Sequence, residues 1–369
     1  MKVAYLSLYY NHHQKELASE MSKLCDFTFI ETGYMPEERK KLGYYDEARP
    51  EYVIHISKDT EACKKTLSEA DAIIYGNAPT EIIKKCIENK KLVFKYSERI
   101  FKEKPNWYEL PFRAIKYKKE NKATYLLCAS AYTASDYAKT GAFKNKAFKW
   151  GYFPECKKYE SVDTLLDKKQ KNSILWCGRI IDWKHPEYAL RLAKRLKSDG
   201  YDFTLSIVGD GSRLGEIIKL SYELDVEDRV QLLGSMSPDL VREKMEQSEI
   251  YIATSDRKEG WGAVINEAMN SGCAVVASNE MGAAPYLIKN GENGLLYFND
   301  DENQLYEKVK FLLDNKEITK EYSKNAYKAI VEEWNAGVAS RRFIELATSI
   351  LEGKNSLNLF QSGICSSAK

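Results

Sequence analysis

The chain alternates short apolar runs, rich in β-branched residues, with longer amphipathic stretches, and this alternation occurs twice along its length. Such alternation is typical of parallel sheets covered by helices on both faces. In the first half we expect strands at 3–8, 27–30, 72–75, 92–96 and 124–129, with helices at 14–23, 80–89 and 131–140. In the second half we expect strands at 174–177, 204–208, 230–233, 250–253 and 274–277, with helices at 186–198, 213–224, 239–247 and 263–270. The pattern predicts two Rossmann-like α/β halves.

The length of 369 residues also favours two domains, since one domain commonly takes about 100–200 residues. We expect an N-terminal domain over 1–154 and a second domain over 173–333. Residues 155–172 are charged and weakly periodic, which predicts a linker. Residues 355–369 are polar, and we expect them to form a flexible tail.

Composition limits the classes of partner and compartment. A net charge of only +2 gives no global reason to expect nucleic acid. No apolar run approaches the roughly 18 residues of a membrane-spanning helix, and the N-terminal apolar run is too short for a signal peptide. The eight cysteines are scattered without any C-x-x-C pair. Free thiols in a reducing compartment explain them better than disulfides do, so we expect the cytoplasm.

Basic residues are concentrated between Lys84 and Lys122. This segment contains thirteen Lys and Arg residues but five acids, so it carries +8 while the remaining residues carry −6. Aromatic residues are interleaved with the basic ones. One interpretation is a solvated, lysine-rich face. The other is a surface attracted to anionic lipid headgroups, which would make the protein peripheral on the inner face of a membrane.

The strongest chemical motif begins at Glu259, after the expected strand at 250–253, and continues into a helix. Glycines let a ligand approach the backbone closely, and backbone N–H groups at a helix start suit an anion such as a diphosphate. Two carboxylates, Glu259 and Glu267, would flank this anion and accept hydrogen bonds from sugar hydroxyls. The alternative is an ordinary surface loop before an amphipathic helix. The substrate-binding residues that we expect here are Gly260, Trp261, Gly262, Ala263, Val264 and Glu267.

A second motif follows the strand at 174–177, where Gly178 precedes two cations, Arg179 and Lys184. Cations at a strand end can neutralise the charge that develops on a departing nucleoside diphosphate. Many enzymes that transfer sugars use a metal held by an Asp-x-Asp pair instead, but no two aspartates in this sequence are spaced in that way. The four histidines do not form a recognisable metal site either. We therefore expect no metal, with Arg179, Lys184 and Glu259 as the catalytic residues.

A third loop, with Asp210 and Gly211 at its centre, is similar to a dinucleotide-binding fingerprint. Its spacing is G-x-G-x-x-x-G, and no acidic residue ends a strand about twenty residues later. We therefore interpret it as a tight turn near the nucleotide and reject an NAD-dependent oxidoreductase.

Together, the G-R-x4-K element, the V-G-D-G loop, the L-L-G strand end at Leu232–Gly234 and the E-x7-E motif resemble those of family-4 retaining glycosyltransferases. The resemblance covers roughly 174–298. It implies a GT-B fold, in which two Rossmann-like domains face each other across a cleft and a final helix, about 334–352, packs back on the first domain. It further implies that the second domain binds a nucleotide sugar, UDP-sugar by common usage, as co-substrate, with no other cofactor. Glu259 would contact the donor sugar, Glu267 the ribose, Arg179 and Lys184 the diphosphate, and the loop after Leu233 the base.

The first half departs from the commonest pattern of that family. Where many members have a glycine-rich loop after the first strand, this chain has Tyr9-Tyr10-Asn11-His12-His13. His12 or His13 could contact the transferred sugar or the acceptor, or could cap the helix that starts near Gln14. The acceptor would be a saccharide or a lipid-linked glycan. The rival interpretation is a non-catalytic partner subunit with the same fold.

Overall fold

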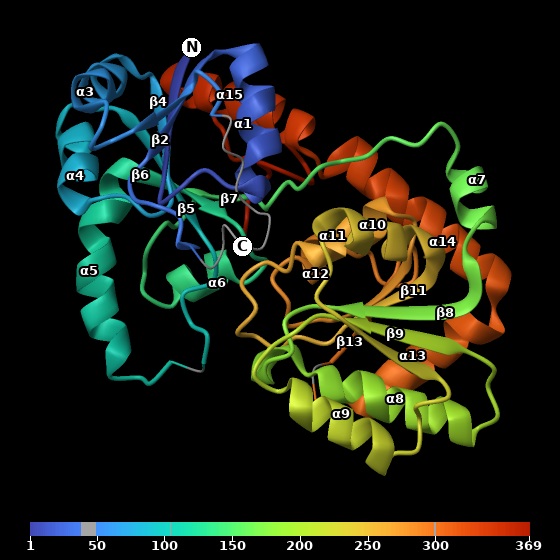
Figure 1. The fold of residues 1–369 in the computed structure, drawn as a ribbon. Helices are drawn as coiled ribbons and strands as arrows, with labels where there is room; N and C mark the ends of the chain where they lie inside the picture. The colour runs from blue at the N-terminus through green and yellow to red at the C-terminus, as the bar shows by residue number, and fades with distance from the viewer. Residues whose placement is uncertain (38–48, 104, 299) are drawn as a thin grey trace. The chain divides into compact units, whose positions relative to one another are not determined.

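The computed structural model describes residues 1–37, 49–103, 105–298 and 300–369. The chain divides into two compact units, one built from Met1–Glu155 and Trp334–Lys369 and the other from Cys156–Glu333 (Figure 1). The first unit therefore draws on both ends of the chain, whereas the second is continuous.

The first unit is built on a seven-stranded sheet in the order β3-β2-β1-β4-β5-β6-β7, with every pairing parallel. Its strands are β1 (Lys2–Ser7), β2 (Asp26–Glu31), β3 (Val53–His55), β4 (Ala72–Tyr75), β5 (Leu92–Ser97), β6 (Thr124–Cys128) and β7 (Ala147–Lys149). Its helices include α1 (His12–Leu24), α3 (Thr60–Glu69), α4 (Thr80–Glu88), α5 (Glu109–Ala123), α6 (Thr133–Ala138) and α15 (Ala336–Leu351). The central strands are apolar runs that are buried almost completely, as in the all-buried β4.

The helix α15 packs against α1, and the two lie side by side in Figure 1. Phe343 of α15 is fully buried and makes edge-to-face contacts with Phe94 of β5 and with Trp150. These aromatic contacts tie the end of the chain into the core of the first unit.

The structure differs from the expectation of a flexible tail over 355–369 in residues 364–368, which pair with the sheet. Ile364 and Cys365 are fully buried, and backbone hydrogen bonds join Lys149 of β7 to Ser366 and Cys365 at 2.8 Å each. Ser367 forms an antiparallel bridge with Phe148. The tail thus covers the free edge of β7, and its order comes from backbone pairing, which leaves little trace in side-chain composition.

The second unit has a six-stranded parallel sheet in the order β10-β9-β8-β11-β12-β13. Its strands are β8 (Gln170–Cys177), β9 (Thr204–Val208), β10 (Val230–Gly234), β11 (Ser248–Ala253), β12 (Ala274–Ser278) and β13 (Leu295–Tyr297). Its helices are α7 (Val162–Asp167), α8 (Pro186–Ser198), α9 (Leu214–Glu223), α10 (Pro238–Gln247), α11 (Val264–Asn270), α12 (Ala284–Leu287), α13 (Glu302–Asp314) and α14 (Lys316–Lys328), with a 3-10 turn at Asp182–Lys184 and a π-helical turn at Ala329–Glu333. One apolar core packs a face of this sheet against α8, α9 and α13.

The expectation of an irregular linker over 155–172 is corrected by this fold. The segment contains α7, and β8 begins at Gln170. Lys169, just before β8, is buried, and its ammonium donates hydrogen bonds to the backbone carbonyls of Met245, Ser248 and Ser271 at 2.7–2.9 Å. One of the charged residues that suggested a linker, Lys169, therefore ties α10 and α11 to the sheet.

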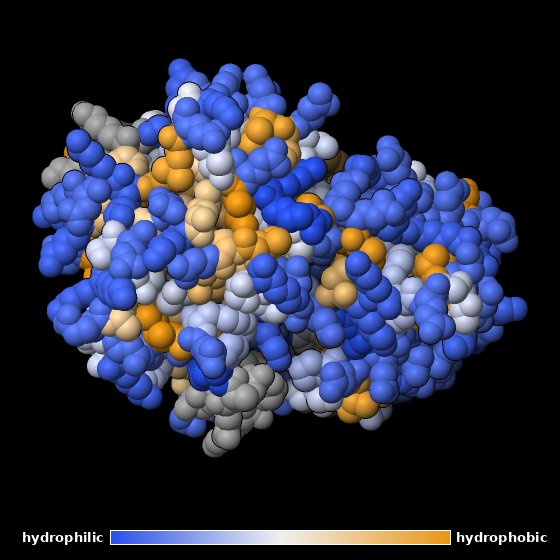
Figure 2. Space-filling view, turned by 90° about the horizontal axis from the view of Figure 1, so that it is seen from above, coloured by the Kyte–Doolittle hydropathy of each residue, from blue (hydrophilic) through white to orange (hydrophobic). Residues whose placement is uncertain are grey.

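The face drawn in Figure 2 is mainly hydrophilic, with apolar side chains gathered in several patches. Among the described residues, no helix is long and apolar enough to cross a membrane.

Candidate functional site in the second unit

The loops after β8 and β11 start at the point where the strand order of the second sheet reverses. β8 pairs with β9 on one side and with β11 on the other, so the chain leaves β8 and β11 in opposite directions along the sheet. In open parallel sheets, ligands bind outside the carboxyl ends of strands at such a switch point. The two strongest sequence motifs both begin here.

The loop after β8 carries Arg179 and the 3-10 turn that ends at Lys184. Arg179 is exposed, and its guanidinium lies 5.5 Å from the centre of the Trp183 ring. Lys184 is mostly buried and followed by His185, which adopts the left-handed conformation at φ 48° before α8 begins at Pro186. A left-handed residue other than glycine is uncommon, and here it redirects the chain from the turn into the helix.

Lys184 and Glu259 form an ion pair, with Nζ 2.6 Å from Oε2 and side-chain exposures of 12% and 16%. The two loops are also joined through Thr254, whose hydroxyl donates to the carbonyl of Lys184 at 2.5 Å and accepts from the indole of Trp176 at 2.8 Å. The backbone N–H of Asp256 donates to the carbonyl of Trp183 at 2.9 Å. The structure therefore brings together two residues that belong to separate sequence motifs.

His185 strengthens the same junction, and sequence reasoning missed it. Its Nδ1 lies 3.0 Å from Glu187 of α8 and its Nε2 lies 3.5 Å from Asp256 of the loop after β11. Burial alone would lower the pKa of His185, but the hydrogen bond and the charges of Glu187 and Asp256 outweigh it, so the pKa is raised. The only signal in the sequence was its place directly after Lys184.

The loop that leads into α11 is packed tightly. The indole of Trp261 is buried and donates from Nε1 to the Asn266 side chain at 2.8 Å, so the ring that we expected to bind substrate packs inside the unit. Gly262 has φ +90°, and a Cβ there would meet Met281 at 2.6 Å. Helix α11 begins at Val264 and is seven residues long. Of the expected backbone donors, Gly262 and Ala263 therefore precede the helix and Val264 opens it.

Glu267 lies on α11 and is half-buried. Burial raises the pKa of its carboxyl to about 7, partly opposed by the positive charge of Arg242. A carboxyl with this raised pKa loses its proton close to neutral pH. The resulting carboxylate accepts hydrogen bonds better than the protonated carboxyl does.

The glycines of the third loop serve backbone packing. A Cβ on Gly209 would lie 1.8 Å from the carbonyl oxygen of Gly178, and one on Gly211 would lie 2.3 Å from that of Ile180. The backbone N–H of Ile180 donates to the carbonyl of Asp210 at 2.9 Å, and the exposed Asp210 side chain accepts from Gly211 at 2.6 Å. The loop after β9 thus supports the loop after β8. The half-buried Leu233 lies at the end of the adjacent β10.

In the first unit, His12 and His13 are the first two residues of α1. Asn11 caps the helix, since its side chain accepts from the N–H of His13 at 2.9 Å, so the capping role considered for a histidine belongs to Asn11. The ring of His13 stacks on Tyr152, whose hydroxyl donates to Glu98 at 2.5 Å. These side chains follow β1, β5 and β7, and so lie at the carboxyl edge of the first sheet.

Two acidic residues of the first unit have defined roles. Glu31, at the end of β2, is buried, accepts from the N–H of Tyr10 at 2.8 Å and pairs with Arg49 at 3.1 Å. Glu31 therefore fixes the loop that follows β1. The signal for Glu31 in the sequence was a carboxylate directly after an apolar strand.

Arg99 of the basic segment is also buried, 3.7 Å from the buried Asp136, so it adds no charge to the surface.

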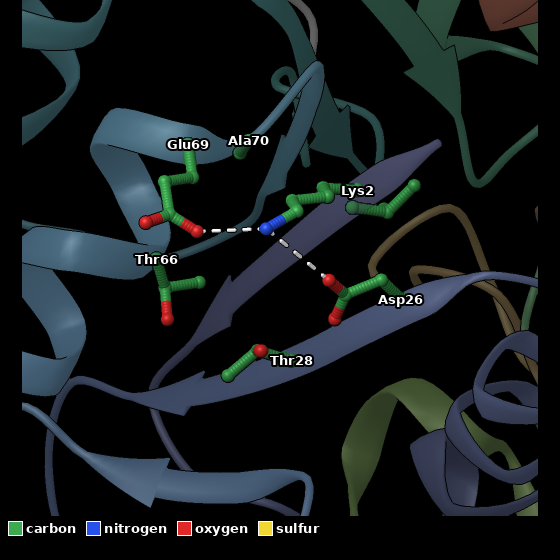
Figure 3. Close-up of a pocket in the computed structure, with 7 residues that line it drawn as sticks. Lys2, Asp26, Thr28, Thr66, Glu69 and Ala70 are labelled. Atoms are coloured by element: carbon green, nitrogen blue, oxygen red, sulfur yellow. Dashed lines mark hydrogen bonds and ion pairs between the residues drawn. The ribbon is translucent and has the colours of Figure 1, made fainter.

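A small pocket on the first unit, drawn in Figure 3, lies at the opposite edge of that sheet. Lys2 reaches into it and pairs with Glu69 at 2.7 Å and with Asp26 at 3.5 Å. Because Lys2 and Asp26 open β1 and β2, the pocket lies at the amino ends of the strands, away from the edge where ligands bind. Within the described ranges, no group of three or more His, Cys, Asp and Glu residues could hold a metal ion.

Each unit has a sheet of parallel strands covered by helices, and a chain with two such units has the GT-B fold of glycosyltransferases. Residues 159–329, almost the whole second unit, match the family model described as glycosyl transferases group 1. Over 154 residues the chain is 32% identical to the N-acetylgalactosamine-N,N'-diacetylbacillosaminyl-diphospho-undecaprenol 4-alpha-N-acetylgalactosaminyltransferase of Campylobacter jejuni, covering 42% of this chain and 40% of that relative. The chain thus spans less than half the length of this curated relative.

Solved structures agree with the fold over nearly the whole chain. HepE of Anabaena, in complex with UDP and glucose, has a TM-score of 0.69 at 15% identity, covering 95% of this chain and 100% of that one. The pneumococcal O-GlcNAc transferase GtfA, in complex with UDP and GlcNAc, has a TM-score of 0.68 at 12% identity, covering 95% and 99%. At these identities the likeness is one of fold.

Proposed function

We propose that this protein is a retaining, metal-independent glycosyltransferase that moves a sugar from a nucleotide diphosphate sugar to a saccharide or lipid-linked glycan acceptor. The observation that carries the proposal is the ion pair between Lys184 and Glu259, held at the switch point of the unit that matches the glycosyltransferase model. The pair sets a cation and a carboxylate side by side where a phosphate and a sugar hydroxyl would have to be bound together.

The donor would lie along the carboxyl edge of the second sheet. Arg179 and Lys184 would contact the diphosphate, because cations there stabilise a leaving group that gains charge. Glu259 would accept hydrogen bonds from the donor sugar, and Glu267 from the ribose. The backbone and small side chains of the surrounding loops would line the rest of the site, namely Gly178, Asp210, Gly211, Leu233, Gly260, Gly262, Ala263 and Val264.

In the reaction that we propose, the bond between the anomeric carbon and the diphosphate oxygen breaks while the acceptor oxygen bonds to the same face of that carbon. The acceptor proton passes to the departing diphosphate oxygen, so no separate base is required. Lys184 would stabilise the oxygen that leaves, and its pairing with Glu259 fixes its position before the donor arrives. Positioning and charge stabilisation would therefore supply the rate increase.

A UDP-sugar is the donor that we favour, and the likeness in fold to HepE and GtfA, both solved with UDP, supports it. The similarity to a transferase whose name specifies a diphospho-undecaprenol substrate supports a lipid-linked glycan acceptor. His12 and His13, at the carboxyl edge of the first sheet, would contact the acceptor or the transferred sugar. All eight cysteines are free, which supports a reducing compartment, the cytoplasm, with the basic segment 84–122 drawn to an anionic membrane surface.

A panel of UDP-, GDP- and ADP-sugars tests the proposal. We expect one donor to raise the unfolding temperature of the parent, since a ligand at about 100 times its Kd stabilises by about 2.7 kcal/mol. The same donor should be hydrolysed or transferred by the parent and much more slowly by Lys184→Ala. Donor binding without turnover on any acceptor would instead indicate a non-catalytic partner subunit. Absence of any thermal shift would reject the nucleotide-sugar site altogether.

A further inference from the structure

Four large apolar side chains stand exposed together at the start of α5. The exposed fractions are 81% for Trp107, 55% for Tyr108, 75% for Phe112 and 71% for Ile115. Among the described residues, Trp107, Phe112 and Ile115 are the most exposed of all large apolar side chains. Scattered apolar residues are normal on a protein surface, but a contiguous group of this kind marks an interaction site.

Two of these residues share a side of the helix, and the other two lie directly before it. Phe112 and Ile115 are three residues apart on α5, so they share a face. Trp107 and Tyr108 immediately precede α5, and their rings meet edge-to-face with centres 6.1 Å apart. Tyr117 of the same helix is buried and packs on Tyr137 of α6. The helix therefore presents a second apolar side, away from its own core.

Cations accompany this apolar side. Lys116 is exposed on α5. Lys84 and Lys85 are exposed on α4, which lies next to α5 on the same side of the sheet in Figure 1. Long cationic side chains beside exposed aromatic rings suit a boundary between an apolar layer and anionic headgroups.

We propose that Trp107, Tyr108, Phe112 and Ile115 insert into the headgroup region of an anionic lipid bilayer, with the neighbouring lysines contacting the headgroups. A bilayer fits better than a protein partner because Trp and Tyr have amphipathic rings and because the surrounding charge is positive. The inference deepens the proposed function, since a lipid-linked acceptor presents its glycan at such a surface. The binding itself does not depend on the transfer reaction.

Sedimentation of the full chain with vesicles tests this surface. The parent should bind vesicles of phosphatidylcholine with phosphatidylglycerol and should bind pure phosphatidylcholine poorly. The double variant Trp107→Ser, Phe112→Ser should bind at least about tenfold more weakly, because two large apolar side chains leave the lipid. The matched control is the double variant Tyr222→Ser, Phe298→Ser in the second unit. It removes two aromatic side chains that are 65% and 64% exposed, and it should bind vesicles like the parent.

Tryptophan fluorescence gives a second, positional measurement. Trp107 is largely exposed, whereas Trp150, Trp176 and Trp261 are each 1% exposed, Trp334 is 4% exposed, and Trp183 is half-buried in the second unit. Brominated lipids should therefore quench mainly Trp107. The Trp107→Phe variant should keep most of the vesicle binding but lose most of the quenching.

Unchanged vesicle binding in the double variant, or equal quenching in Trp107→Phe, would overturn the proposal. A parent that sediments as a dimer without lipid, and becomes a monomer in the double variant, would assign the surface to a second copy of the chain instead. Donor hydrolysis separates this inference from the proposed function. The double variant should hydrolyse the donor as the parent does, and a parent that binds vesicles but turns over no donor would contradict only the proposed function.

Discussion

The ammonium of Lys184 and the carboxylate of Glu259 lie 2.6 Å apart, although each belongs to a different loop at the carboxyl edge of the second sheet. Both are mostly withdrawn from solvent, so each charge depends on the other for compensation. Replacing one of them should therefore affect both the folded state and the bound donor.

Lys184→Ala should lower kcat by about 10²–10³-fold, as the loss of one preorganised charge at a leaving group does. It should also lower the free energy of unfolding, because Glu259 remains buried without its cation. Adding Glu259→Gln should recover part of that stability but none of the activity. Denaturant unfolding and steady-state kinetics on the parent, the two single variants and the double variant check this, and fully additive losses of stability would show that the pair is not coupled.

Arg179→Ala should give a different result, because Arg179 is exposed and its guanidinium lies over the Trp183 ring. We expect a comparable fall in kcat, about 10²-fold or more, with the free energy of unfolding within about 0.5 kcal/mol of the parent. Near-normal turnover in this folded variant would mean that the diphosphate binds elsewhere.

Chelation should leave transfer largely intact, because the proposed site supplies its positive charge from Arg179 and Lys184. The measurement is turnover in excess EDTA, with Mg²⁺ or Mn²⁺ added back. Loss of activity that the metal restores would contradict the metal-independent mechanism.

The contribution of Glu267 to the stability of the protein should fall as pH rises from about 4.5 to 7. Its folded-state pKa is raised from 4.5 to about 7 by burial, so the folded state binds the proton more tightly than the unfolded state does. The stabilisation is complete below the unfolded pKa and is lost above the folded one, on the order of 3 kcal/mol. Glu267→Gln should remove this part of the pH dependence in denaturant unfolding at pH 5 and pH 8, and it should weaken nucleotide binding. An identical slope in both proteins would exclude this cause.

Gly209→Ala should destabilise the protein by several kcal/mol, because its new Cβ would overlap the carbonyl oxygen of Gly178 and the backbone there has φ +145°. Gly215→Ala is the matched control, since Gly215 lies near the start of α9 with open space where a Cβ would be. We expect the control to be neutral or stabilised by up to about 1 kcal/mol in thermal unfolding. Equal tolerance of both substitutions would contradict the packing described for these loops.

Much of the sheet architecture could be predicted from sequence, because buried parallel strands are nearly continuous apolar runs. The stretch Ala274–Ser278, for example, is entirely buried as β12. The strands β3 and β7 have three residues each, too few to show a period, and sequence reasoning missed them. The helix α5 was missed as well, because Phe112 and Ile115 place apolar residues on a side that faces no core.

The candidate site was predictable only in part. The position of Lys184 and Glu259 at strand ends follows from the alternation of elements, since the carboxyl ends of parallel strands share one edge. Their direct contact does not, because it depends on strand order and on the turn at His185. The burial of Trp261 could not be predicted either, since a tryptophan between two glycines can line a ligand site or pack in a core.

Because the first unit takes in Trp334–Lys369, its fold is completed only after the whole second unit has been synthesised. The second unit is continuous in sequence, so it can fold while α15 and the strand-pairing residues 363–368 are still being made. A fragment that stops at Glu333 would then contain a finished second unit and a first unit with an open edge and an uncovered α1. Expression of such fragments would yield a folded second unit more readily than a folded first unit.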